Sequence, residues 1–371
     1  MSDFALAAAA LDTARLDPMG SGLPVEADIM LREAPPPPFD WIREGTSCWM
    51  FDEGGNFGFP RIGVEAEPHT WDNRLYQSNV VFPDGRQLIG LGRGPAPSIL
   101  NRDGNPMVMG AGPLTFECLE PFHRWRVTFD GEAVEGSVRG QIDGTNDISE
   151  QFNRTYDPAR LVPLRYEFEM VGVVPANVMD HSPANFFKFG KGKQRDAASV
   201  GLGWRFEQMM RGDGEITIGG ETQSLRLVGS RIKRRSVRTE SLFLRGHCWQ
   251  AVVFPDGRAA GYEARPMHDD GQEPYNEGFV YQDGKLHHAR ATKMPWLRRL
   301  TERGDDVSFE LESELGIIRI EGVTEFSTYM LMSKNMHGLD LQQSGARYSW
   351  DGQSAYGMVE RSATPGQLAR D

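Results

Sequence analysis

A carboxylate beside aromatic residues is the combination that acid chemistry in an apolar site requires. Asp72 stands between Trp71 and Asn73, and Tyr76 follows four residues later. Protonating an alkene or an alcohol needs a carboxylic acid that keeps its proton near neutral pH, and burial raises a carboxyl pKa. We predict that Asp72 is such an acid, with Tyr76 beside it and Asn73 holding it in place. The alternative is an ordinary surface carboxylate or a buried ion pair.

Glu117 is the second candidate for this acid. It lies in a stretch where Leu114, Phe116 and Cys118 alternate with polar residues, as in a half-buried strand. Glu117 is out of phase with these apolar residues. Its side chain therefore faces solvent, or faces a lumen if the apolar residues pack elsewhere.

Three further carboxylates stand near aromatic residues, Glu44, Asp180 and Glu360. Asp180 precedes His181, and because adjacent side chains seldom face each other, we expect a capping or hinge role rather than an acid–base pair. For Glu360 we expect a buried ion pair with an arginine of a neighbouring strand.

His247 and Trp249 form a candidate pocket pair, because residues two apart on a strand share a face. Cys248 points the other way and is predicted to be a core cysteine. Trp49 and Trp125 are further candidates for lining a ligand cavity, although tryptophans are more often part of a core.

One strong basic cluster stands out in an otherwise acidic chain, and it consists of Arg231, Lys233, Arg234, Arg235 and Arg238. In one interpretation, Arg231 and Arg235 bind an acidic group on the ligand. In the other, the cluster is a solvated edge strand whose cations prevent aggregation.

Residues of metal-ligand type occur at 268–270 and at 287–288, but without the spacing of a zinc site. Glycines recur at 90–94, but no helix pattern follows them, so a phosphate loop is not predicted. We expect neither a metal nor a cofactor.

These residues are positioned by a chain that repeats itself. The sequence Val-Val-Phe-Pro-Asp-Gly-Arg occurs at 80–86 and again at 252–258. Each copy reads as a strand, a tight Pro-Asp-Gly turn and a second strand. Many short alternating stretches with glycine turns surround both copies, which is typical of a barrel or sandwich. The sequence predicts an all-β fold of two tandem antiparallel β-barrels that arose by duplication.

The expected boundaries are a helical N-terminal arm with a proline-rich spacer at 1–38, a first barrel at 39–190 and a second barrel at 191–371. A barrel of about eight strands is wide enough to hold one small molecule.

Composition excludes several classes of protein. Among 371 residues, 39% are hydrophobic and the net charge is −12, which argues against a nucleic-acid binder. No apolar run reaches the roughly 20 residues of a membrane span. The three cysteines are widely spaced and the N-terminus is a poor signal peptide, so we expect a cytoplasmic protein.

Three stretches resemble the two-domain, lipocalin-like family of carotenoid 1,2-hydratases and AttH-like proteins. They lie at 114–127, 206–218 and 348–362. The resemblance covers roughly residues 45–365 and implies lipocalin-like barrels that bind small hydrophobic ligands.

The chain departs from this family at one position. The hydratases carry a motif His-Asp-His-Asn/Ser-Trp-Gly, whose acidic residue is the expected proton donor. Here the stretch 229–236 places Ile232 at the position of that acid, and isoleucine has no proton to donate.

Two hypotheses follow. In the first, the protein is a cofactor-independent enzyme that uses a buried carboxylic acid for hydration, dehydration, isomerisation or cyclisation of a terpenoid, steroid or polyketide-like molecule. In the second, it is a non-catalytic carrier of such a ligand, which can bear an acidic group. The sequence leaves the oligomeric state open.

Overall fold

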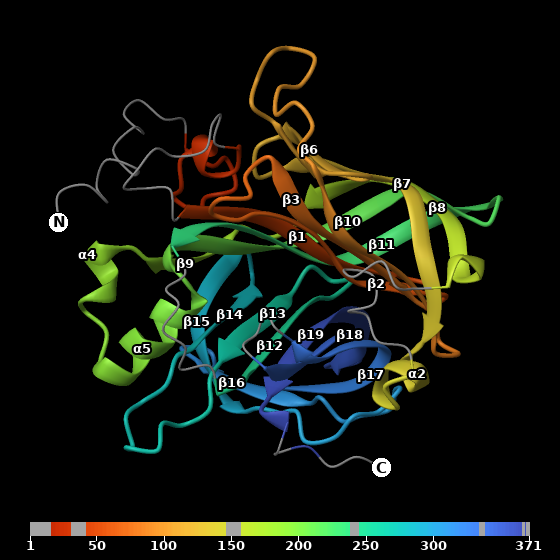
Figure 1. The fold of residues 1–371 in the computed structure, drawn as a ribbon. Helices are drawn as coiled ribbons and strands as arrows, with labels where there is room; N and C mark the ends of the chain where they lie inside the picture. Colours follow the sequence, from red (N-terminus) through yellow and green to blue (C-terminus); the bar gives the residue numbers. More distant parts are fainter. Residues whose placement is uncertain are drawn as a thin grey trace.

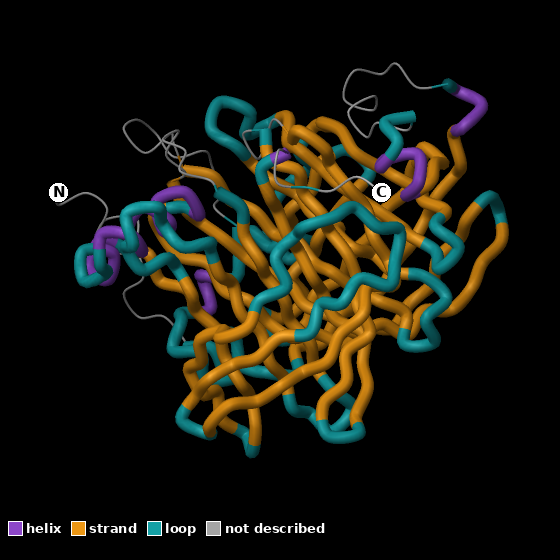
Figure 2. The backbone as a smooth tube through the Cα atoms, turned by 90° about the horizontal axis from the view of Figure 1, so that it is seen from below, coloured by secondary structure: helices purple, strands orange, loops and turns teal. Residues whose placement is uncertain are grey.

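The computed structural model describes residues 16–30, 42–145, 157–237, 245–333, 338–365 and 368. Its strands form two bodies, a large sheet drawn above a barrel in Figure 1. Strands dominate both bodies and the short helices lie at the periphery (Figure 2).

The first sheet has eleven strands and contains the first copy of the repeat. Its central path runs β4-β3-β2-β1-β11-β10-β8-β7-β6-β5, and β9 pairs with β10. β4 also pairs with the C-terminal part of β7, so eight of these strands form a closed path. The bounds are β1 (Ile42–Asp52), β2 (Gly58–Ala66), β3 (Asn73–Val81), β4 (Arg86–Pro95), β5 (Val108–Ala111), β6 (Leu114–Glu120), β7 (Arg124–Ser137), β8 (Leu161–Gly172), β9 (Asn177–His181), β10 (Leu202–Ile218) and β11 (Glu221–Val237).

The second body is a closed barrel in which consecutive strands are neighbours. Its strands are β12 (His247–Val253), β13 (Ala259–Ala264), β14 (Asn276–Gln282), β15 (Lys285–Lys293), β16 (Phe309–Ser313), β17 (Gly316–Ser333), β18 (Leu339–Trp350) and β19 (Gln353–Ala363). The predicted all-β architecture of two barrel-like domains is confirmed.

The expected division at residue 190 does not match the change of sheet. β10 and β11 follow that position, yet both belong to the first sheet, where β11 lies between β1 and β10. The chain crosses to the second barrel only between Val237 and His247. The first body needs the hairpin of β10 and β11 to complete its closed path. The hydrophobic pattern of the sequence alone does not reveal this pairing.

The two copies of the repeated sequence form the same turn. Phe82 N–H donates to the Arg86 carbonyl at 3.0 Å, and Phe254 N–H donates to the Arg258 carbonyl at 2.8 Å. The glycine of each turn has a positive φ, 85° at Gly85 and 89° at the second copy, as this turn requires.

The valines before each turn also correspond. Val80 and Val252 are buried inside their own barrels, whereas Val81 and Val253 belong to the cluster between the two bodies. This equivalence agrees with a duplication.

Helices are few and short among the described residues. They are η1 (Val25–Ala27), α2 (Val138–Ile142), η2 (Pro158–Arg160), α4 (Pro183–Phe186) and α5 (Lys191–Val200). None of these described helices has the length and apolarity needed to cross a membrane. The described part of the predicted helical arm, residues 16–30, contains the single 3₁₀ turn η1; the spacer at 35–38 lies outside the described residues.

Asp180 takes the capping role expected for it. Its carboxylate accepts hydrogen bonds from the Ser182 N–H at 2.8 Å and from the Asn185 amide at 2.7 Å, at the start of α4. It therefore holds the connection before β10 and does not pair with His181.

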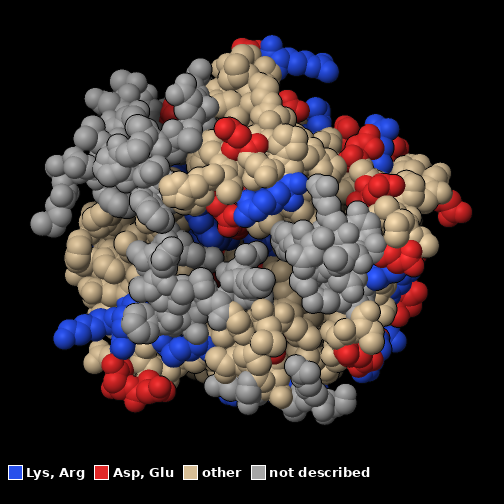
Figure 3. Space-filling model, in the orientation of Figure 1, with Lys and Arg blue, Asp and Glu red and all other residues tan. Residues whose placement is uncertain are grey.

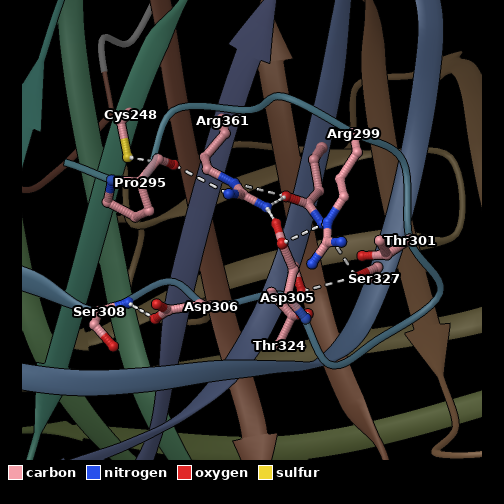
Figure 4. A network of polar contacts seen from close by, with 12 residues as sticks. Cys248, Pro295, Arg299, Thr301, Asp305, Asp306, Ser308, Thr324, Ser327 and Arg361 are labelled. Atoms are coloured by element: carbon pink, nitrogen blue, oxygen red, sulfur yellow. Dashed lines mark hydrogen bonds and ion pairs between the residues drawn. The ribbon is translucent and has the colours of Figure 1, made fainter. Parts of the chain in front are cut away.

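Polar side chains fill one end of the second barrel (Figure 4). Arg361 points into the barrel and donates to Asp305 at 2.6 Å, to Gln342 and to the Pro295 carbonyl. Arg299 also reaches Asp305, at 3.2 Å. These contacts tie the loop at 294–308 across the barrel, so this arginine is a structural residue.

Candidate active site

The predicted acid Asp72 lies at the surface. It precedes β3 and is exposed, as is Asn73, while Trp71 and Tyr76 are half-buried against the first core. The expectation required apolar surroundings that disfavour a charged carboxylate. An exposed side chain lacks them, so the structure does not support Asp72 as a protonated acid.

Glu117 also lies outside the core. It projects from β6 beside Arg126 of β7, which donates to it at 3.2 Å, while Leu114 and Phe116 are buried on the opposite face. This is the solvent-facing orientation that the alternation allowed. Glu117 therefore lies outside the apolar surroundings that the predicted acid requires.

The basic cluster is neither an open anion site nor a solvated edge. β11 is a central strand, and Arg231 is fully buried with Asp28, its two nitrogens lying 2.8 and 3.1 Å from the carboxylate oxygens. Asp28 also accepts from the Trp125 indole at 2.9 Å. Residues 16–30 thus close one end of the first barrel through a buried ion pair. Arg238 lies outside the described residues.

A second buried carboxylate pairs with two more residues of this cluster, while Arg234 lies 4.0 Å from Glu65. Glu44 accepts from Lys233 and from Arg235, each at 2.8 Å. Burial disfavours the charged form of Glu44, but the two cations outweigh it and lower its pKa to about 2. Arg231 and Arg235 therefore already have protein partners, which does not favour their predicted role in ligand binding.

Three predicted pocket residues do come together, between the first sheet and the second barrel. Trp49 of β1 and Trp249 of β12 are both buried, with ring centroids 4.9 Å apart in an edge-to-face arrangement. His247 lies on the same face of β12, two residues before Trp249. Only side chains join the two bodies here, because no strand of the first sheet pairs with a strand of the barrel.

Glu207 of β10 is the carboxyl group at the centre of this interface. It is almost fully buried, and the Trp249 indole N–H lies 3.2 Å from both of its oxygens. Burial raises the pKa of Glu207 to about 7, and the hydrogen bond from Trp249 and the charge of Arg205 only partly oppose that rise. With a pKa of about 7, roughly half of Glu207 keeps its proton at pH 7, which suits an acid catalyst near neutral pH.

Ion pairs across the interface surround this acid. On one side, Arg205 of β10 pairs with Glu263 of β13, which also accepts from Arg265 at 2.7 Å. On the other side, Glu360 of β19 accepts from Arg61 of β2 at 3.3 Å. The expected arginine partner of Glu360 is thus found, although it belongs to the other body.

His247 completes this second group. Its Nε2 lies 3.2 Å from Glu360 and its Nδ1 lies 2.6 Å from the Ser362 hydroxyl. Burial lowers the pKa of His247. Burial opposes ionisation of Glu360, but the His247 hydrogen bond and the Arg61 charge lower its pKa to about 2. Glu207 and Glu360 are therefore two interface carboxyls with opposite protonation states, which is a common basis for dividing acid and base roles.

Glu207 also has an informative place in the sheet. It is the direct cross-strand partner of Ile232, the residue at the position of the family's acid. Directly paired residues on antiparallel strands project to the same face. The chain thus presents a buried carboxyl one strand away from the expected position and toward the same side.

An opening lies close to this interface. A cavity of about 1080 Å³ at one end of the second barrel is lined by Arg245, Arg265, Trp296 and Ser362, among others. Ser362 of β19 contacts His247 of β12. Trp249 lies two residues after His247 on β12. Figure 3 shows that the molecule is hollowed between the first sheet and the barrel, where Lys and Arg side chains gather.

Among the described residues, no group of three or more His, Cys, Asp or Glu side chains is arranged to hold a metal ion. Cys48, Cys118 and Cys248 are all buried, and burial raises the pKa of each thiol. The core role predicted for Cys248 is confirmed.

Comparison with known proteins gives a family without an assigned function. Residues 32–365 match the model of a domain of unknown function, DUF7064. The chain belongs to this family. No curated protein sequence matches the chain.

Solved structures show the relationship in fold. A protein described as a "putative AttH" from Nitrosomonas europaea has a TM-score of 0.52 at 14% identity, over 90% of this chain and 98% of that one. CghA with Sch210972 scores 0.49 at 9% identity, over 87% and 88% of the two chains. Kievitone hydratase from Nectria haematococca scores 0.43 at 9% identity, over 90% and 93%. The likeness to the AttH-like protein shows a shared fold, which agrees with the two-barrel architecture that the sequence resemblance implied.

Sequence reasoning missed Glu207, although it lies inside one of those stretches. A signal was present, because Glu207 follows Phe206 in a strand and precedes Gln208 and two methionines. The signal pointed to a strand but not to the face on which the carboxyl would be buried. Only the pairing with β11 and the contact with Trp249 reveal that face.

Proposed function

We propose that this DUF7064 protein is an enzyme that protonates a hydrophobic small molecule between its two barrels, with Glu207 as the acid. One observation carries the proposal: Glu207 is a buried carboxyl with a pKa raised to about 7, and it is the cross-strand partner of Ile232, the residue that the sequence resemblance aligns with the acid of the hydratases. One positioned acid supports hydration, dehydration, double-bond isomerisation and cyclisation.

The proton transfer can be written from these side chains. The carbon–carbon double bond of the substrate supplies the electron pair that takes the proton of Glu207, which leaves a carbocation and a carboxylate. The Trp249 N–H and the charge of Arg205 stabilise that carboxylate. The cation then adds water, loses a neighbouring proton or is attacked by a second double bond, and a proton returns to Glu207.

The aromatic surroundings favour the cationic intermediate. The rings of Trp49 and Trp249 lie edge to face beside the acid, and an aromatic face attracts positive charge. Guanidinium groups lie over both rings in the free protein, Arg61 at 5.3 Å from the Trp49 centroid and Arg205 at 5.1 Å from the Trp249 centroid. A substrate cation uses these faces only if it displaces those groups.

The substrate class follows from the lining of the interface. Phe51, Met209 and Phe326 are buried there together with the two tryptophans, so most of the contact surface is apolar. Burial of apolar surface contributes about 25 cal/mol for each Å² removed from water. A terpenoid, steroid or polyketide-like molecule matches the polarity of these side chains. The cavity beside Ser362 is a separate, largely charged opening, with Arg265, Glu277 and Arg290 among its lining residues.

A non-catalytic carrier is the second candidate. Ile232 at the position of the family's acid favours it, because that replacement removes the usual proton donor. The same apolar interface would then bind a ligand without changing it.

Deuterium incorporation separates the two candidates. The purified protein is incubated in D₂O with a panel of terpenoid and steroid alkenes, and each product is analysed by mass spectrometry. The enzyme hypothesis predicts products that gain one deuterium on carbon. Glu207→Gln should remove this activity, while Glu215→Gln, an exposed glutamate on the same strand, should retain it.

Two results would count against the enzyme hypothesis. Turnover that survives Glu207→Gln at the wild-type rate would exclude this carboxyl as the acid. Tight binding of an alkene by wild-type protein, with no deuterium entering it, would establish the carrier.

A further inference from the structure

A row of buried polar atoms without partners crosses the first sheet on the face that meets the barrel. The Trp49 indole nitrogen, the Ser230 hydroxyl and both amide atoms of Asn79 are buried and make no hydrogen bond with any described atom. Arg61 Nε is also buried and makes no hydrogen bond with any described atom. Buried polar atoms are normally paired, so a run of unpaired ones is unusual.

Sheet register places these residues in one line. Ser230 of β11 is the direct cross-strand partner of Trp49 on β1, and Asn79 of β3 is the direct partner of Arg61 on β2. Arg61 lies over the Trp49 ring, which joins the two pairs. The unpaired atoms therefore run across four adjacent strands.

All of these side chains project toward the second barrel. Trp49 belongs to the cluster between the two bodies. Ser230 projects to the same face of its strand as Val228 and Ile232, which belong to this cluster. Asn79 projects to the same face as Val81, which also belongs to it. Glu207 projects from the same face of β10, two residues before Met209, the cross-strand partner of Ser230. The row thus lies immediately beside the candidate acid.

The hydrogen-bonding groups of this row favour an uncharged oxygen atom as their ligand. The Trp49 indole is a donor only, a serine hydroxyl can donate, and an asparagine amide can donate and accept. Nearby guanidinium groups already have partners, since Arg61 pairs with Glu65 and with Glu360. An uncharged carbonyl or hydroxyl oxygen would satisfy the Trp49 and Ser230 donors without requiring a counter-ion.

We propose that Trp49 and Ser230 form a subsite for a carbonyl or hydroxyl oxygen of an otherwise apolar ligand, with Asn79 as a further polar contact along the row. The subsite deepens the proposed function, on which it rests for its place beside Glu207. No described strand of the first sheet pairs with the barrel, so a ligand that reaches the row displaces side-chain contacts such as the Arg61–Glu360 and Arg205–Glu263 ion pairs.

Two probes of matched shape test the subsite. 2-Acetylnaphthalene carries a carbonyl oxygen where 2-isopropylnaphthalene carries a methyl group, and neither has an alkene side chain for the acid to protonate. The affinity of each is measured by calorimetry. Wild-type protein should prefer the ketone by about tenfold, as expected for one or two hydrogen bonds inside a dry site. Trp49→Phe and Ser230→Ala should each reduce this preference severalfold, whereas Ser354→Ala, an exposed serine, should not.

Stability provides a measurement that needs no ligand. Removing a buried polar atom that has no partner is neutral or stabilising, whereas removing a paired one is destabilising. Ser230→Ala and Asn79→Leu should therefore keep or raise the Tm of the ligand-free protein. A fall of several degrees in both variants would show that these atoms have structural partners, and would overturn the proposal.

The binding experiment tests the oxygen subsite independently of the catalytic role of Glu207. Glu207→Gln should retain the preference for the ketone even if it abolishes turnover, because binding is measured without reaction. Equal affinity of wild-type protein for the two probes, or binding of neither, would overturn the oxygen subsite and leave the role of Glu207 to the deuterium experiment.

Discussion

Trp249 of the second barrel donates its indole N–H toward both carboxyl oxygens of Glu207 in the first sheet, at 3.2 Å from each. This contact joins the two bodies at a buried carboxyl whose pKa is raised to about 7. The hydrogen bond favours the ionised form, so it limits how far burial raises the pKa. The acid strength of Glu207 is therefore set jointly by the two barrels.

Trp249→Phe should raise the pKa of Glu207 further. The substitution removes the donor and keeps most of the ring, and a hydrogen bond to a charged group is worth about 1.5 kcal/mol, or about one pH unit. The carboxyl stretch in infrared spectra, taken as the difference from Glu207→Gln, reports this titration. Trp350→Phe, which changes a tryptophan outside the interface, is the control. An unchanged midpoint would show that the indole does not tune the acid.

Stability should depend on pH through Glu207. Its folded-state pKa of about 7 lies above the ordinary 4.5, so the folded protein holds the proton more tightly than the unfolded chain does. The protonated carboxyl therefore adds to the free energy of unfolding below pH 4.5. This contribution is lost as pH rises to about 7, and the loss is on the order of 3 kcal/mol. Urea unfolding of wild-type protein and Glu207→Gln across this range isolates this contribution, because the buried histidines titrate alike in both proteins. The free energy of unfolding of the wild type, minus that of the variant, should fall by about this amount as pH rises.

Asp28 should be essential for the stability of the first barrel. Asp28→Ala leaves the fully buried Arg231 without its carboxylate, and such a broken buried pair costs about 3–5 kcal/mol. Combining it with Arg231→Met should recover much of the loss, because the unpaired charge is then gone. The urea midpoint measures both effects, with Asp72→Asn as an exposed control. If the double variant is no more stable than the single one, charge pairing is not the reason.

The three cysteines should be unreactive in the folded protein. All are buried, and burial raises the pKa of each thiol, so little reactive thiolate exists at neutral pH. Ellman's reagent should find almost no thiol under native conditions and three per chain in denaturant. Rapid reaction of a thiol in folded protein would contradict the burial of that cysteine.

Much of the fold could be predicted from local pattern. The repeated Pro-Asp-Gly sequence determines a turn wherever it occurs, because Gly85 and its counterpart supply the positive φ and the aspartate bonds the backbone ahead. Alternation with period two identifies strands and their buried faces. These properties depend on neighbouring residues, so the all-β class and the duplicated hairpins were accessible from the sequence.

The partners of the charged residues were decided only by the tertiary structure. Asp28 meets Arg231 across about 200 residues of chain, and Glu207 meets Trp249 across the gap between two bodies. Asp72 and Glu207 both stand beside aromatic residues in the sequence, yet one is exposed and the other is buried. The free energy of ionising a carboxyl depends on the dielectric surroundings and charges within a few ångströms. Strand register and the packing of one barrel against the other create those surroundings, and neither is encoded in the spacing of residues along the chain.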